Sequence, residues 1–217
     1  MGTSPYKNKL GTRLPGTTTI TGSELGWAKG VLITWANRLG LEGIEAGKYV
    51  DNLAEIGTLA HDMVVNQLLG RETDISDHSP KQVEKAQKCL DSYNKWKSGQ
   101  KIVPIVVEQP LVSEVYQFGG TPDFYGAVND VLTLIDYKTG KGIYDEHFIQ
   151  VAGGYVILLE EAGHKIEDVV ILNIPRSEGD SFQSVTITPR FREICKKVFL
   201  NCLDNYRLHK IMKGERA

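Results

Sequence analysis

The most constraining feature of the chain is the segment FYGAVNDVLTLIDYK, residues 124–138, which predicts two strands joined by a tight turn. Asn129 and Asp130 suit the turn, because both residue types tolerate the backbone angles of a two-residue hairpin. Side chains alternate between the faces of a strand, so Asp136 and Lys138 point to one face and Tyr137 to the other. The hairpin is also expected to bring Asp123 back beside Asp136.

Two carboxylates side by side repel each other unless something neutralises their charge. A hard divalent cation with oxygen ligands is the usual solution, so Mg²⁺ or Mn²⁺ is the first expectation. Such an ion polarises a phosphoryl oxygen and lowers the pKa of water, while a nearby lysine offsets charge that develops in the transition state. These residues alone leave an alternative open, in which Asp123 is a turn residue and Asp136 with Lys138 is an exposed pair on an edge strand.

Other residues follow in a fixed order around the hairpin. The motif GTLAH ends at His61, Glu108 precedes the hairpin, and GTPD ends at Asp123. IDYKTGK then contains Asp136 and Lys138, and Gln150 and Tyr155 come next. In this order the chain resembles the PD-(D/E)XK nuclease superfamily, in particular its RecB-like branch of phage exonucleases, CRISPR-associated nucleases and lambda-exonuclease-like enzymes.

The resemblance implies a metal site and a catalytic lysine. Asp123 and Asp136 would bind the metal, with the backbone carbonyl of Tyr137 as a further ligand. Lys138 would be the catalytic lysine. His61 would be another metal ligand or a phosphate contact.

The resemblance also implies roles for residues around that centre. Glu108 would hold a water on the metal or pair with Lys138, and Gln150 and Tyr155 would contact DNA from a helix. The family spacing is Q-x-x-x-Y, and this chain has one residue more. A bulge at Gly153-Gly154, inside a helix expected over about 144–162, would bring both side chains back to one face. Lys141 is expected at the mouth of the cleft, where it would contact DNA.

The order of the elements predicts the fold. Helical periodicity covers the stretch after Ser23 and residues 47–69 and 80–97, strands begin near Ile102, and a long helix is expected over 189–213. A strand-helix-strand order beside the hairpin predicts an α/β (α+β) fold with a central mixed β-sheet flanked by helices. The resemblance makes this a restriction-endonuclease-like core. We expect a flexible arm over 1–22 and a single nuclease domain over 23–217, with a helical part at 23–98 and a catalytic core at 101–217.

Composition sets further limits. The 217 residues suffice for one domain, and the formal net charge of -2 neither indicates nor excludes nucleic-acid binding, because an acidic metal site lowers the total. The three cysteines show no C-x-x-C spacing and none lies in the first 88 residues, so no iron–sulfur cluster is expected. Without a signal peptide or a membrane-spanning apolar run, we expect a cytoplasmic protein of a bacterial or phage-infected host cell.

The sequence therefore predicts a deoxyribonuclease that depends on one or two Mg²⁺ or Mn²⁺ ions. An exonuclease for DNA ends or single strands, in phage-like recombination, replication or repair, is the leading hypothesis. DNA is the expected partner, while a recombination or replication protein and a homo-oligomer stay open. The alternatives are a catalytically silent nucleic-acid-binding module of the same fold, a sequence-independent endonuclease, and a hydrolase of a small phosphorylated molecule.

Overall fold

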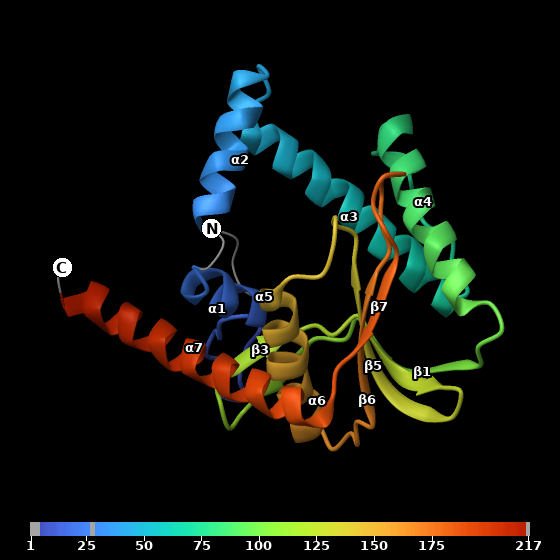
Figure 1. Cartoon of the computed structure of the whole chain (residues 1–217). Helices are drawn as coiled ribbons and strands as arrows, with labels where there is room; N and C mark the ends of the chain where they lie inside the picture. The colour runs from blue at the N-terminus through green and yellow to red at the C-terminus, as the bar shows by residue number, and fades with distance from the viewer. Residues whose placement is uncertain (1–4, 27–28, 216–217) are drawn as a thin grey trace.

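The computed structural model describes residues 5–26 and 29–215 and is built around a five-stranded sheet with helices on both faces (Figure 1). The strand order is β1-β4-β5-β6-β7, in which β5 and β6 are parallel and all other neighbours are antiparallel. The predicted mixed sheet flanked by helices is confirmed. The strands are β1 (Ile102–Val107), β4 (Phe124–Val128), β5 (Val131–Lys138), β6 (Asp168–Asn173) and β7 (Gln183–Thr186).

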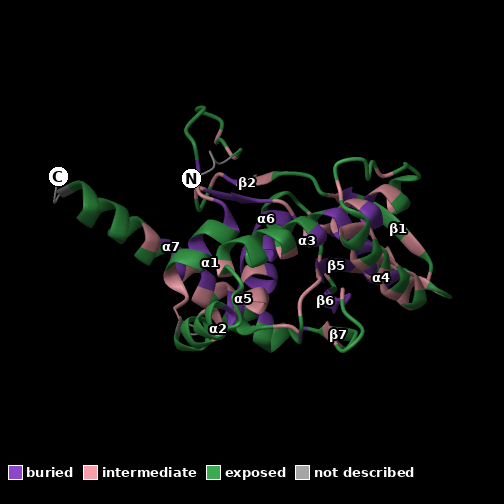
Figure 2. Cartoon of the chain, turned by 90° about the horizontal axis from the view of Figure 1, so that it is seen from above, coloured by how far each residue is buried: buried purple, intermediate pink, exposed green. Residues whose placement is uncertain are grey.

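Two hydrophobic cores lie on opposite faces of the sheet, and strand β5 contributes to both. Leu134 packs in one core, whereas Ile135 and Tyr137 pack in the other, as the alternation of a strand requires. The Tyr137 side lies under α3 (Ala46–Leu69) and α4 (Pro80–Lys97). The Leu134 side is covered by four helical segments, whose buried residues appear in purple in Figure 2. These are α5 (Asp145–Phe148), the π-helix η1 (Ile149–Tyr155), α6 (Val156–Glu161) and α7 (Pro189–Glu215).

The described part of the N-terminal stretch packs against the rest of the chain. Helix α1 (Thr17–Glu24) occupies part of the stretch 1–22, and its Ile20 is fully buried. Before it, Gly16 forms a parallel bridge to Gly119 in β3 (Phe118–Gly120), which pairs with β2 (Leu111–Ser113). The helix expected after Ser23 is instead divided, and α2 (Lys29–Leu41) stands apart from the sheet (Figure 1).

The hairpin between β4 and β5 has the predicted turn. Asn129 and Asp130 have φ angles of 51° and 68°, as a type I′ turn requires. The ladder pairs Val128 with Val131 and ends at Phe124 opposite Ile135. One step further along this register, Asp123 faces Asp136. The hairpin therefore brings the two carboxylates to the same end of the sheet.

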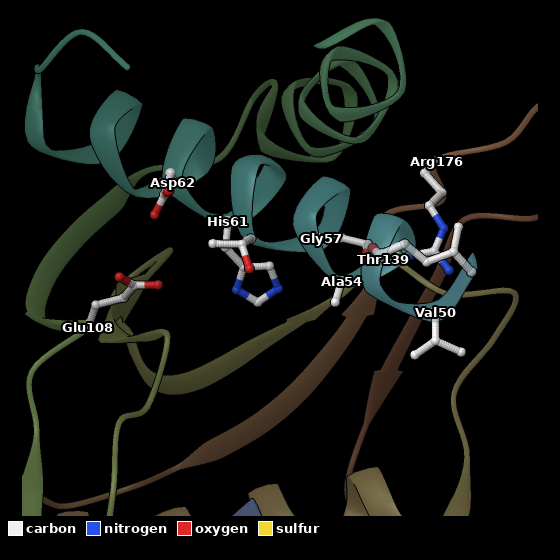
Figure 3. Close-up of a pocket in the computed structure, with 10 residues that line it drawn as sticks. Val50, Ala54, Gly57, His61, Asp62, Glu108, Thr139 and Arg176 are labelled. Atoms are coloured by element: carbon white, nitrogen blue, oxygen red, sulfur yellow. Dashed lines mark hydrogen bonds between the residues drawn. The ribbon is translucent and has the colours of Figure 1, made fainter. Parts of the chain in front are cut away.

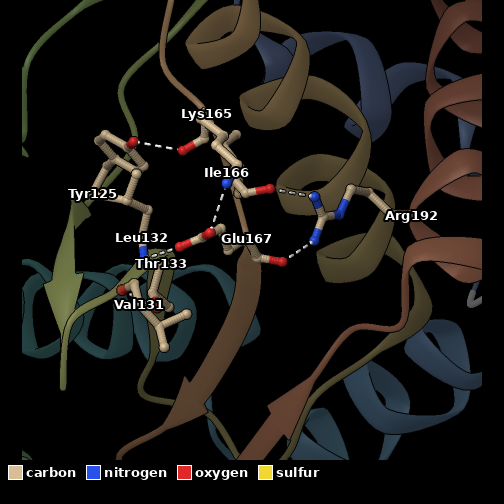
Figure 4. A network of polar contacts seen from close by, with 8 residues as sticks. All are labelled: Tyr125, Val131, Leu132, Thr133, Lys165, Ile166, Glu167 and Arg192. Atoms are coloured by element: carbon tan, nitrogen blue, oxygen red, sulfur yellow. Dashed lines mark hydrogen bonds and ion pairs between the residues drawn. The ribbon is translucent and has the colours of Figure 1, made fainter.

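A polar network fixes the opposite end of β5 and β6 (Figure 4). The Glu167 N–H donates to the Leu132 carbonyl at 2.8 Å, and the Leu132 N–H donates to Glu167 Oε2 at 3.0 Å. Arg192, from α7, donates to the carbonyls of Ile166 and Glu167 at 3.0 and 2.9 Å. Because Arg192 is only 8% exposed, these bonds form largely away from water. The network holds the register of the parallel pair and anchors α7 to it.

The cysteines are free and buried on both sides of the sheet. Cys89 lies in the core under α3 and α4, and Cys195 and Cys202 lie in the core under α7. Among the helices of residues 5–26 and 29–215, none has the length and apolar character needed to cross a bilayer.

Candidate metal centre

Three side chains that could share one metal ion meet where β4 begins. His61 comes from α3, Glu108 follows β1 directly, and Asp123 precedes β4. One ligand atom of each lies within 4.8 Å of the others, and His61 Nδ1 is 3.5 Å from Asp123 Oδ2. A cavity of about 620 Å³ opens beside them. Glu108 and Asp62 lie on one side of His61, and Thr139 and Arg176 lie on the other (Figure 3).

His61 is held by the position of α3 over the end of β5. Its side chain is 24% exposed, and its ring meets the Tyr137 ring edge-on, with centroids 6.1 Å apart. One turn earlier, a Cβ on Gly57 would lie only 3.1 Å from Thr139 Oγ1. The glycine therefore allows the helix to lie close to the segment that follows β5.

Glu108 adopts a backbone conformation that is uncommon for a residue with a side chain. Its φ is 43°, and its N–H donates to the Asp123 carbonyl at 3.1 Å. Such left-handed residues cost about 1–3 kcal/mol and persist where the surroundings impose them. Although Glu108 is exposed overall, partial desolvation of its carboxyl raises the pKa, which His61 opposes and nearby Asp62 reinforces. The structure thus turns Glu108 toward the cavity instead of continuing strand β1.

Asp123 is largely buried, with a side chain 13% exposed, and Oδ2 accepts a 2.7 Å hydrogen bond from the Tyr137 N–H. Burial, followed by the charge of Asp136, raises the pKa of the Asp123 carboxyl to about 6. His61, Lys138 and the hydrogen bond from Tyr137 oppose this rise. A cation at this position would oppose the shift, because its charge would favour the ionised form of Asp123 and offset the repulsion between the two carboxylates.

Asp136 and Lys138 form an ion pair next to this cluster. Lys138 Nζ lies 2.6 Å from Asp136 Oδ2, and the two side chains are 18% and 1% exposed. Burial alone would lower the pKa of Lys138, but the charges of Asp136 and Asp123, with the hydrogen bond to Asp136, together raise it. Within the described chain, the three-residue cluster contains Glu108 and not Asp136. Lys138 is paired with Asp136 and not with Glu108.

The structure also joins Gln150 to Tyr155. Residues Ile149–Tyr155 form a π-helix, which is the expected bulge, and Gln150 Nε2 donates to the Tyr155 hydroxyl at 2.6 Å. Gln150 also donates to Thr18 Oγ1 of α1 at 3.3 Å. Tyr155 is only 5% exposed, so its hydroxyl lies inside the protein. Lys141 is exposed and lines a groove beside the cavity.

Several further residues lie near the centre. Thr139 and Arg176 line the cavity, and Arg176 Nη1 donates to the Leu53 carbonyl at 3.2 Å. His147 Nδ1 accepts from the Tyr144 N–H at 3.1 Å, and burial, followed by the charge of Lys138, lowers its pKa to about 4. The parallel pairing of β5 and β6 was the available signal for Thr139 and Arg176, because parallel strands end at the same sheet edge.

The ligand set suits a divalent cation. Two carboxylates favour Mg²⁺ or Mn²⁺, and the imidazole of His61 shifts the preference toward Mn²⁺, because nitrogen ligands suit transition metals better. A negative site with a buried lysine alongside is also suited to bind a phosphate group once a cation has neutralised the carboxylates.

No family model and no curated protein matches the chain. Among solved structures, a candidate exonuclease from Eubacterium rectale is 11% identical with a TM-score of 0.43, and the match covers 74% of this chain and 68% of that one. The alkaline exonuclease of Laribacter hongkongensis is 12% identical with a TM-score of 0.34, and 72% and 84% of the two chains are covered. That enzyme was also solved in complex with dAMP. At these TM-scores the likeness does not assign a family.

Proposed function

We propose that the chain is a divalent-metal-dependent DNA nuclease of the PD-(D/E)XK type. The carrying observation is that His61, Glu108 and Asp123 converge within 4.8 Å, with the buried Asp136–Lys138 pair beside them. Three side chains that could ligate one metal ion, with a lysine next to them, are the parts that phosphodiester hydrolysis requires. The order of the motifs along the chain supports the same reaction.

The three clustered residues would hold the ion. When bound, the cation supplies Lewis acidity toward a phosphoryl oxygen and neutralises the carboxylates. The donor set supports Mn²⁺ or Mg²⁺. Asp136 and the Tyr137 carbonyl are the further ligands that the motif resemblance implies, and Tyr137 is positioned next to Asp123 by its own N–H.

Lys138 would stabilise negative charge on the scissile phosphate. Its raised pKa keeps the ammonium protonated at neutral pH, and Asp136 fixes its position. Oriented charge of this type, already in place before the reaction, is the largest contribution in many hydrolytic enzymes. Asp136 would therefore act through Lys138 as well as through the charge that it adds next to Asp123.

DNA ends or single strands are the proposed substrates, in a phage-like recombination, replication or repair role. Gln150 and Lys141 are the proposed DNA contacts. Because Tyr155 is buried, its proposed part is to hold the Gln150 amide in place. The one residue that this chain has beyond the Q-x-x-x-Y spacing would then help to place Tyr155 where it can hold Gln150.

The test uses labelled linear, circular, single-stranded and double-stranded DNA with Mg²⁺, Mn²⁺ or EDTA. We expect cleavage of linear or single-stranded DNA by the wild type with either metal, and none with EDTA. Lys138→Ala should be inactive. Lys101→Ala, which removes an exposed lysine that pairs with Asp130 of the remote hairpin turn, should be fully active.

Other outcomes would assign a different function. Cleavage of circles would indicate an endonuclease. Binding without cleavage in either metal would contradict the nuclease proposal and favour a silent nucleic-acid-binding module.

A further inference from the structure

A second groove adjoins the candidate metal centre. Helices α2 and α3 form one wall, and the loops that follow β5 and β6 form the other. The groove has a volume of about 460 Å³. It shares Val50, Leu53 and Arg176 with the cavity beside His61 and Glu108. A chain-like ligand could therefore lie in both at once.

Aromatic rings line this groove at the surface. Trp35 and Tyr49 lie with ring centroids 6.0 Å apart and planes inclined at 60°. Tyr49 is 36% exposed and Tyr144, on the opposite wall, is 51% exposed. On α2, Leu32 adds apolar surface and is 56% exposed. A contiguous exposed patch of this type on a soluble protein indicates a binding surface.

The charges of the groove favour an anionic ligand. Lys85, Lys141 and Arg176 line it together with the carboxylates of Glu146 and Asp180. The groove thus has an excess of positive charge, although the whole chain has a formal net charge of -2. Cations interleaved with aromatic rings are the usual composition of surfaces that bind single-stranded nucleic acid.

We propose that this groove binds the unpaired bases of single-stranded DNA, so that substrate reaches the metal centre as a single strand. The inference rests on the proposed nuclease function. Aromatic side chains stack on bases whose faces are free, and a duplex keeps those faces covered by neighbouring base pairs. The rings would therefore favour a single strand over a duplex, while Lys141 and Arg176 contact its phosphates.

The first experiment distinguishes the contribution of the bases to binding affinity from that of the phosphates. Fluorescence anisotropy, with Ca²⁺ in place of Mn²⁺, compares a labelled oligothymidylate, an abasic strand of equal length and charge, and a duplex. The wild type should bind the oligothymidylate about tenfold more tightly than the abasic strand, and more tightly than the duplex. Trp35→Ala and Tyr144→Ala should each lose on the order of tenfold for oligothymidylate and little for the abasic strand.

Two variants serve as controls for that experiment. Trp35→Phe retains a stacking surface and should keep most of the affinity. Tyr116→Ala removes a ring that is 38% exposed and does not line the groove, so its affinity should equal that of the wild type. Circular dichroism melts of all variants would show that each is folded.

The second experiment separates the groove from the metal centre. Hydrolysis of bis(p-nitrophenyl) phosphate with Mn²⁺ requires the centre but no base contacts, so Trp35→Ala should match the wild type and His61→Ala should be inactive. A wild type that binds DNA as described but hydrolyses no phosphodiester would overturn the nuclease function and leave the groove supported as a binding site. Normal hydrolysis, with equal affinity of wild type, Trp35→Ala and Tyr144→Ala for oligothymidylate, would overturn the groove assignment.

Discussion

Gln150 donates its side-chain amide to the hydroxyl of Tyr155 at 2.6 Å, across a π-helical turn that brings residues five apart onto one face. The same turn places Gly153 against α7, where an added Cβ would lie 2.7 Å from the Cys195 carbonyl oxygen. Wide π-turns inside α-helices are rare and occur frequently at functional sites. In this protein the turn lies beside the proposed nuclease centre and fixes the amide that is proposed to contact DNA.

Tyr155→Phe should weaken that positioning with limited damage to the fold. Loss of one buried hydrogen bond should lower the free energy of unfolding by about 1 kcal/mol. Because Gln150 keeps only its longer bond to Thr18, the affinity for DNA should fall as well. Urea unfolding and DNA-binding titrations would measure both effects. Unchanged affinity in Tyr155→Phe together with reduced affinity in Gln150→Ala would show that Gln150 does not depend on Tyr155.

Metal binding should stabilise the protein through the three clustered residues. Mn²⁺ at one hundred times its dissociation constant should add about 2.7 kcal/mol to the free energy of unfolding. His61→Ala, Glu108→Gln and Asp123→Asn should each lose most of that gain. Asp62→Asn, which changes an acid that lines the cavity but is not part of the cluster, should keep it. Thermal melts with Mn²⁺ and with EDTA would test this, and an equal gain in all four variants would place the ion elsewhere.

The raised pKa of Asp123 predicts how the stability of the metal-free protein depends on pH. Its carboxyl has a pKa of about 6 in the folded state against an ordinary 3.8, so the folded state binds more protons between these values. The contribution of this group to the free energy of unfolding is therefore greatest below the lower value. It falls as pH rises, and is lost above the higher one.

Asp123→Asn should remove this pH dependence. In EDTA at neutral pH the variant should be more stable than the wild type by on the order of 2 kcal/mol, and this advantage should vanish near pH 4. The asparagine amide oxygen can still accept the hydrogen bond from the Tyr137 N–H. Urea unfolding across this pH interval is the measurement. A wild type as stable as the variant at neutral pH would contradict the shifted pKa.

Lys138→Ala should lose stability as well as activity. The change leaves the Asp136 carboxylate, 1% exposed, without its partner, and an unpaired buried charge costs about 3–5 kcal/mol. Asp136→Asn/Lys138→Met removes both charges at similar volume and should recover most of the stability while remaining inactive. Urea unfolding and DNA cleavage would separate the two effects. If Lys138→Ala were as stable as the wild type, the Asp136–Lys138 pair would not be buried. If the double variant cleaved DNA, neither residue would take part in the reaction.

The local patterns of the sequence were sufficient for most of the elements. Helix α4 was predicted with both its ends, as a charged helix that begins at Pro80, and the structure adds the cap at Ser79. The hairpin turn at Asn129 and Asp130 and the bulge around Gly153 also followed from short-range chemistry. Helix α1 could not be predicted from local patterns. It is stabilised by the burial of Ile20 against distant parts of the chain and not by its own threonine-rich sequence.

The amino-acid sequence by itself determined the residue types of the candidate centre. It also determined that Asp136 and Lys138 share one face of the strand, since strand alternation and hairpin pairing are local properties. Only the tertiary structure decided which side chains meet. The crossing of α3 over β5 and the left-handed turn at Glu108 form the cluster of His61, Glu108 and Asp123, and Lys138 is left paired with Asp136. Contacts between residues so far apart in the chain depend on how helices pack on the sheet, and no local pattern encodes that packing.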